Sequence, residues 1–325
     1  MRSYINPLIK ILILLILPNI YAQGDDTSTE IEVKLIVESK YEFHNRFGEY
    51  LEILQYQIKT NFDKLGKVTS IIHYGGEGNL QRKDIYHYNN DGFLIELSSY
   101  GPDGLLAWKN IFTYNEHNKI TQEASYDPDG SLDWEDKYKY DRNDHLLEKI
   151  SYLVEDKNEY VSRTFRYNSQ NQLAKETSYY PDGKRSSDFI YTYNFDGKLL
   201  EEKFYDYYKK LTLKDQYKYD RKDNLKEWIL IDKNGKLVNN YEGIAEKFYQ
   251  YNRKNNIIGI EMKNDQGNIV KKEIFQYGKD ERLLKSVKFY VKFIFGKIHE
   301  IPIEKTTFQY ERRYFLLCTA SLFIV

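Results

Sequence analysis

Three aspartates recur at one phase of a repeated pattern, and carboxylates spaced in this way are the first candidates for chemistry. Asp103, Asp129 and Asp182 would lie on successive turns along one edge of a sheet, where carboxylate oxygens can bind calcium. Each of them also lies between a proline and a glycine, and Pro-Asp-Gly is a preferred turn sequence. Turn chemistry explains the pattern better than calcium does, so we predict no metal site at these residues.

The histidines, glutamates and the single cysteine also lack a catalytic spacing. The histidines fall at different phases of the repeat and form no His-x-His or His-Glu-x-x-His pattern. Glutamates recur within the expected strands and alternate with lysine, which indicates cross-strand charge pairs. Cys318 has no cysteine partner, so a disulfide within one chain is impossible. We therefore predict a non-enzymatic protein with no catalytic residue, metal or cofactor.

Aromatic residues that break the repeat are the best candidates for binding. Flat aromatic rings stack on sugars, but regularly spaced tyrosines are expected to fill the buried face of a sheet and to pair across strands. The exceptions that we single out as partner-binding candidates are Trp108, Trp134, Tyr207, Tyr208, Trp228 and Tyr241. Trp108 and Trp134 share one phase in consecutive units, so we expect them to be neighbours. A place in the core is the alternative for these residues.

A repeat of about 26 residues must position all of these side chains. An aromatic-x-aromatic pair recurs along the chain, and a Gly, Asn or Asp four residues later predicts a turn with positive φ. The second aromatic residues of the pairs are Tyr88, Tyr114, Tyr140, Tyr167, Tyr193, Tyr219, Tyr251, Tyr277 and Tyr310. The aromatic residue twelve positions after each pair is expected to share the buried face with the pair, because even spacing keeps side chains on one face of a strand.

These spacings predict an all-β protein of about nine tandem hairpin units. We expect the units to form an elongated antiparallel sheet or an open, solenoid-like spiral, because each repeat contacts only its neighbours. The period is interrupted near 155–160, 239–245 and 291–303, and insertions in repeat proteins often lie on a binding face.

The flanking segments complete the predicted domain organisation. Residues 1–22 have the charge and apolar core of a cleaved signal peptide, so no transmembrane helix is expected in the mature chain. Residues 23–61 are predicted to be a leader with N-terminal capping strands, 62–310 the repeat array, and 311–325 an apolar C-terminal cap. The balance of 48 basic and 49 acidic residues argues against nucleic-acid binding.

The unit resembles the tyrosine–aspartate (YD) repeats of the RHS family. Its closest instance is Tyr193-Asn194-Phe195-Asp196-Gly197-Lys198-Leu199, and Tyr140-Asp141 and Tyr219-Asp220 keep the Tyr-Asp pair itself. The resemblance covers about Phe62 to Tyr310. It implies spiralling β-sheet shells built from consecutive hairpins in exported or surface-associated bacterial proteins. Large members of that family enclose a toxin and carry a C-terminal processing motif, which this sequence lacks.

Three functions fit these features. The first is a surface or envelope scaffold, periplasmic or secreted, that binds a protein or a polysaccharide. The second is a component of a toxin system, such as a carrier, an inhibitor or an immunity-like partner. The third is an outer-membrane β-barrel, since an even number of about 18 to 20 strands is possible. Tight connections at both strand ends and the lack of a lipid-facing Leu/Val band count against the third.

Overall fold

The computed structural model describes residues 32–155 and 157–313, which form 20 β-strands. The predicted signal peptide and residues 314–325 of the predicted cap lie outside these ranges. Within them, no helix is long and apolar enough to cross a membrane. The strands are β1 (Glu32–Arg46), β2 (Glu49–Phe62), β3 (Val68–Gly75), β4 (Leu80–Tyr88), β5 (Leu94–Tyr100), β6 (Leu106–Tyr114), β7 (Ile120–Tyr126), β8 (Leu132–Tyr140), β9 (Leu146–Leu153), β10 (Asn158–Tyr167), β11 (Leu173–Tyr179), β12 (Arg185–Tyr193), β13 (Leu199–Tyr205), β14 (Leu211–Tyr219), β15 (Leu225–Asp232), β16 (Glu246–Tyr251), β17 (Ile257–Lys263), β18 (Ile269–Tyr277), β19 (Leu283–Ile294) and β20 (Lys297–Arg313).

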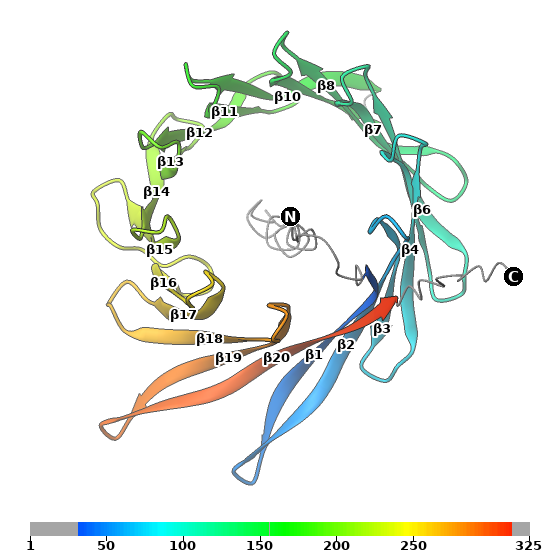
Figure 1. Ribbon diagram of the computed structural model, residues 1–325. Helices are drawn as coiled ribbons and strands as arrows, with labels where there is room; N and C mark the ends of the chain where they lie inside the picture. Colours follow the sequence, from blue (N-terminus) through cyan, green and yellow to red (C-terminus); the bar gives the residue numbers. More distant parts are fainter. Residues whose placement is uncertain (1–31, 156, 314–325) are drawn as a thin grey trace, which may run out of the picture.

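The sheet closes into a single antiparallel barrel (Figure 1). Each strand pairs with the next, and β1 also pairs with β20 over a long register that runs from Glu32–Arg313 to Glu42–Glu304. The prediction of an open sheet or spiral is therefore wrong. Nearest-neighbour contacts between repeats are present, but the accumulated curvature of 20 strands brings the two ends together, and their edges then satisfy each other's backbone groups.

The turns that follow the aromatic pairs define what we call the first rim of the barrel. In the turn after Tyr88, the amide of Asn89 donates to the carbonyl of Phe93 (2.9 Å), and the Asn89 side chain accepts from the Phe93 amide (2.8 Å). Gly92 has φ of 87°, and Asn118 takes the same place at 61° in the next unit. The Asn or Asp that follows the tyrosine in most units therefore stabilises the turn, which explains the recurrence of that pair.

A β-bulge in most strand pairs changes which residues share a face. In the pairing of β4 with β5, Tyr86 lies opposite Leu97 and Lys83 lies opposite Tyr100, with a register shift at His87/Tyr88. Tyr86 and Lys83 are three residues apart, so they point to opposite faces, and Tyr100 lies on the lysine side. The prediction that the aromatic residue twelve positions on shares the face of the pair is wrong, because each bulge adds one residue to the register.

We assign the face with the aromatic pairs to the inside of the barrel. Side chains converge on the concave side of a closed sheet, and several carboxyl groups whose burial raises their pKa, among them Glu202, Asp215 and Glu273, lie on this face, whereas Asp188 is a buried carboxylate on the other. Burial raises the pKa of Glu202 to about 7 and that of Asp215 to about 6, and both residues share this face with Tyr217. Lys139, on the opposite face, is exposed, and Lys137 on the same face is half-exposed.

The second aromatic of each pair also joins neighbouring strands. The hydroxyl of Tyr114 donates to the carbonyl of Leu94 (2.7 Å), and that of Tyr88 donates to the carbonyl of Val68 (2.8 Å). The same bond recurs in every later unit, ending with Tyr310 and Leu283 (2.9 Å). Each of these tyrosines therefore gives a hydrogen-bond partner to the carbonyl of the first residue in the strand that follows the preceding first-rim turn.

Candidate functional site

Two of the predicted binding residues lie in an exposed aromatic cluster at the second rim, which is formed by the other set of turns. Tyr207 and Tyr208 occupy the β13–β14 turn and meet edge to face, with ring centres 5.2 Å apart. Tyr180, from the neighbouring β11–β12 turn, lies 6.3 Å from Tyr207. Tyr208 is 74% exposed, and Lys210 lies over its ring. We call Tyr180, Tyr207 and Tyr208 the aromatic corner.

A basic depression of about 390 Å³ opens on the outer face beside this corner. Strands β10 to β13 and the turn after β13 supply its walls. Four cationic side chains and one carboxylate line it, together with threonine and tyrosine hydroxyls. The charged lining residues are Arg166, Lys175, Arg185, Lys209 and Asp188.

Arg185 connects the depression to the aromatic corner. It occupies a position where most units carry leucine, such as Leu106 and Leu132, and its side chain is largely buried. Both of its terminal nitrogens donate to the carbonyl of Asp206, at 2.7 and 2.8 Å. The guanidinium therefore fixes the turn that carries Tyr207 and Tyr208 against the barrel wall.

A buried carboxylate organises the cations of the depression. Asp188 accepts a hydrogen bond from Thr177 (2.7 Å) and forms an ion pair with Lys175 (3.1 Å). The buried Nε of Arg185 lies 3.6 Å from Asp188 and has no hydrogen-bond partner among the described residues. Asp188 therefore offsets part of the charge of Lys175 and Arg185, and the four cations that line the depression leave an excess of positive charge for an anion.

Arg166 and Lys209 are the two cations that this network leaves uncommitted. Within residues 32–155 and 157–313, neither side chain forms a hydrogen bond or an ion pair. Lys209 has φ of 60°, at a turn position that glycine takes in the Pro-Asp-Gly turns. Both can therefore contact a ligand without losing an existing interaction.

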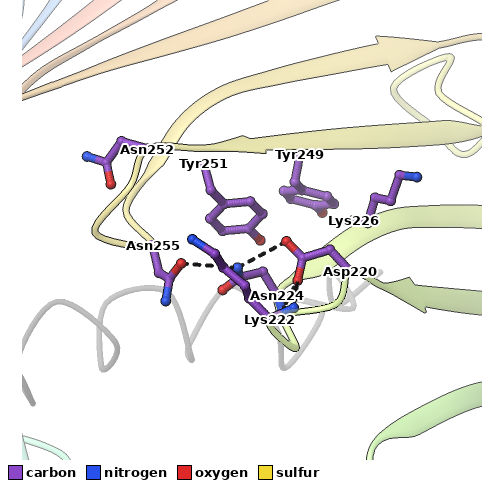
Figure 2. A pocket seen from close by; sticks show the side chains of 8 residues that line it. All are labelled: Asp220, Lys222, Asn224, Lys226, Tyr249, Tyr251, Asn252 and Asn255. Carbon is purple, nitrogen blue, oxygen red and sulfur yellow. Dashed lines mark hydrogen bonds between the residues drawn. The ribbon is translucent and has the colours of Figure 1, made fainter.

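A second, smaller depression of about 290 Å³ lies at the first rim, between two consecutive turns (Figure 2). Tyr249 and Tyr251 extend from the same face of β16, and Asn224 donates to Asp220 (3.1 Å) and to Asn255 (3.4 Å). Hydrogen bonds from the backbone and side chain of Asn224 lower the pKa of Asp220. Because these polar groups already satisfy one another, the simplest role of this depression is to join two turns.

The other predicted binding residues do not gather at one place. Trp108 on β6 and Trp134 on β8 are separated by β7, so the prediction that they are neighbours is wrong: hairpin units place equivalent residues two strands apart. The indole of Trp228 donates to Asp215 (2.6 Å), and Lys247 lies over its ring. Tyr241 is exposed on the inserted segment 239–245.

Several residues of the site were not singled out from the sequence. Tyr180, Lys175 and Asp188 look regular or unremarkable along the chain, and only the register of four strands brings them together. Arg185 was recognisable as an exception at a leucine position. The sequence also raised the possibility of a calcium ladder, and no group of three or more potential ligands lies close enough to hold a metal ion among the residues that the structure describes.

No family model matches the chain, and no curated protein matches it. Among solved structures, a TcdB2–TccC3 complex is 12% identical with a TM-score of 0.41, covering 82% of this chain and 16% of its own. A porin-like protein from Bacteroides uniformis is 10% identical with a TM-score of 0.36, covering 86% of this chain and 98% of its own. The chain thus spans about a sixth of the toxin-complex chains that it matches. These are distant likenesses between β-rich proteins, and they carry no argument about function.

Proposed function

We propose that this chain is a non-enzymatic β-barrel of the bacterial envelope whose outer wall binds an acidic polysaccharide. The basic depression beside the aromatic corner is the observation that carries the proposal. Arg166, Lys209 and Arg185 offer charge to carboxylate, sulfate or phosphate groups, and the exposed tyrosines offer faces on which sugar rings stack. The buried Asp188 is held by its neighbours, which suits a structural anion better than a catalytic acid.

The proposal is tested by measuring affinity for polygalacturonate, with neutral dextran as the reference. Replacing both Arg166 and Lys209 by Gln is expected to weaken binding about tenfold, since two charge-assisted contacts are lost. A matched control replaces Lys64 and Arg253 by Gln, which removes the same charge from first-rim turns and should leave binding unchanged. Equal losses in the two double variants, or equal affinity for dextran, would contradict a specific site.

An outer-membrane barrel is the second candidate, and closure favours it over the open scaffold. The ring has an even number of antiparallel strands, as spanning barrels do. Two features favour a barrel that rests on the surface of the bilayer over a barrel that spans it. Strands β3 to β18 have 6 to 10 residues, at or below the roughly 9 to 11 that a spanning strand needs. The outer face also carries charges such as Lys137, Lys139 and Lys175.

Membrane extraction distinguishes a barrel that rests on the bilayer surface from one that spans the bilayer. A lysine or arginine facing lipid at mid-depth costs about 2–4 kcal/mol, and many such charges would have to be accommodated. We therefore expect alkaline carbonate to release the full-length protein from envelope membranes of a Gram-negative host. Retention in the carbonate-washed membrane, together with a heat-dependent shift on SDS gels, would establish the spanning barrel instead. The toxin-system role stays a prediction, for which stable co-purification with one protein is the test.

A further inference from the structure

Two hairpins at the closure of the barrel differ from all the other second-rim turns. Strands β1 and β20 pair with each other only as far as Glu42 and Glu304. Beyond this point, β1–β2 and β19–β20 continue as separate ribbons, which Figure 1 shows in blue and in orange-red, projecting away from the barrel wall. We call them the two fingers.

Each finger ends in a Phe-Gly turn whose phenylalanine has a left-handed backbone. Phe47 and Gly48 have φ of 55° and 92°, and Phe295 and Gly296 have 49° and 77°. Two-residue hairpin turns with both φ values positive prefer Asn-Gly, and a bulky residue at positive φ is disfavoured. Both phenylalanine side chains are fully exposed, at 107% and 101%. The two phenylalanines therefore stabilise neither the turn conformation nor a hydrophobic core. Each finger exposes one apolar ring to solvent at its tip.

The second finger adds apolar and cationic side chains behind its tip. Phe293 and Ile298 lie directly opposite each other, and both are exposed. Lys292 and Lys297 are exposed beside them. An apolar tip with adjacent lysines is complementary to a bilayer with anionic headgroups, in which aromatic rings enter the interface and lysines stay at headgroup level. The first finger carries Glu49 and Glu52 behind its tip, so the second finger should contribute more to association with an anionic bilayer.

We propose that the second rim docks on the surface of a bilayer that contains anionic lipids, with Phe295 and Phe47 inserted at headgroup depth. The proposal concerns the fingers alone and does not depend on polysaccharide binding. It also gives a barrel with a charged outer wall a way to associate with a membrane that it does not span.

Flotation of the purified protein with lipid vesicles tests this docking. The vesicles contain phosphatidylcholine alone or with about one-third phosphatidylglycerol. Phe295→Asn should reduce the vesicle-bound fraction about tenfold, because the burial of one aromatic ring is lost. Phe47→Asn should reduce it less. Asparagine is favoured at this turn position, so both variants are expected to fold at least as well as the original chain.

Phe195→Asn is the matched control, because Phe195 is also exposed, at 94%, but lies in a first-rim turn. It should leave flotation unchanged. Replacing Lys292 and Lys297 by Gln should remove the preference for phosphatidylglycerol. Equal losses in all three phenylalanine variants, or no binding to either vesicle, would overturn the proposal. So would a dimer seen by light scattering that Phe295→Asn dissociates, since the tips would then contact a second copy of the chain.

Discussion

The regular wall of the barrel and its closure are built from the same hairpins but do different things. Strands β3 to β18 are short, and each unit repeats the turn and tyrosine bond of the one before. The four strands of the closure, β19, β20, β1 and β2, have 12, 17, 15 and 14 residues. Repetition therefore makes a wall of constant height, whereas the irregular ends of the array close the ring and carry the two fingers.

One carboxylate from each region shows how the surroundings of an acid set its pKa. In the wall, Glu202 lies opposite Asp215, and burial together with the charge of Asp215 raises the pKa of Glu202 to about 7. At the closure, burial alone would raise the pKa of Glu304, but the bond from Lys40 (3.0 Å) and the proximity of Lys288 (3.3 Å) hold it below its usual value. Glu304 therefore joins β1, β20 and β19, whereas Glu202 lies opposite a second carboxyl group, that of Asp215, which the indole of Trp228 contacts.

The largest contrast should come from disulfides placed across the two regions. In a Cys318→Ser background, Ser39→Cys with Thr307→Cys bridges β1 and β20, whereas Ser178→Cys with Ser187→Cys bridges β11 and β12. The closure disulfide spans a loop of about 270 residues and should stabilise the barrel by about 5 kcal/mol, against about 3 kcal/mol for the ten-residue loop. Denaturant unfolding measures both. Failure of only the closure disulfide to form would mean that the ring is open.

A smaller effect is expected from the acid pair of the wall. The folded-state pKa of Glu202 is raised, so stability is fully present below the unfolded value and is lost as pH rises through about 7. Glu202→Gln should therefore stabilise the protein by about 2 kcal/mol at pH values above about 8 and change little near pH 4. Thermal unfolding followed across this range gives the measurement. An unchanged pH profile in the variant would show that the pair is not strained.

The tyrosine hydroxyls should contribute equally in both regions. Tyr114→Phe removes the bond to Leu94 in the wall, and Tyr310→Phe removes the bond to Leu283 at the closure. Each change should cost about 1 kcal/mol, because one part-buried carbonyl loses its partner. Urea unfolding compares the two. A much larger loss at Tyr310 would show that closure depends on this bond more than the wall does.

The smallest effect is expected at Glu304. Its pKa is lowered, so its contribution is present at neutral pH and is lost as pH falls through the folded value. Glu304→Gln should destabilise the barrel by less than about 1 kcal/mol at neutral pH, because the pair with Lys40 is partly exposed to water. The difference from the original chain should vanish in acid. A difference that persists in acid would assign the effect to packing instead.

Much of the local structure could be predicted from spacing alone. Tyr88, Asn89 and Gly92 are enough to indicate a strand end, a side chain that stabilises a turn and a left-handed residue. The side of the sheet could not be predicted for Tyr100, because a bulge of one residue is silent in the sequence. The candidate binding residues Tyr207 and Tyr208 were recognisable because they break a pattern. Lys175 and Asp188 of the depression were not recognisable, since cross-strand register alone brings them together.

By itself, the sequence determined a chain of β-hairpins with turns at known phases, because strand period, glycine tolerance and turn-stabilising side chains are local properties. Only the tertiary structure decided that the hairpins form a ring and which face is inner. It also decided which distant side chains form the basic depression and the two fingers. These outcomes depend on curvature summed over 20 strands and on bulges that recur in most strand pairs, and neither property can be read from a single repeat.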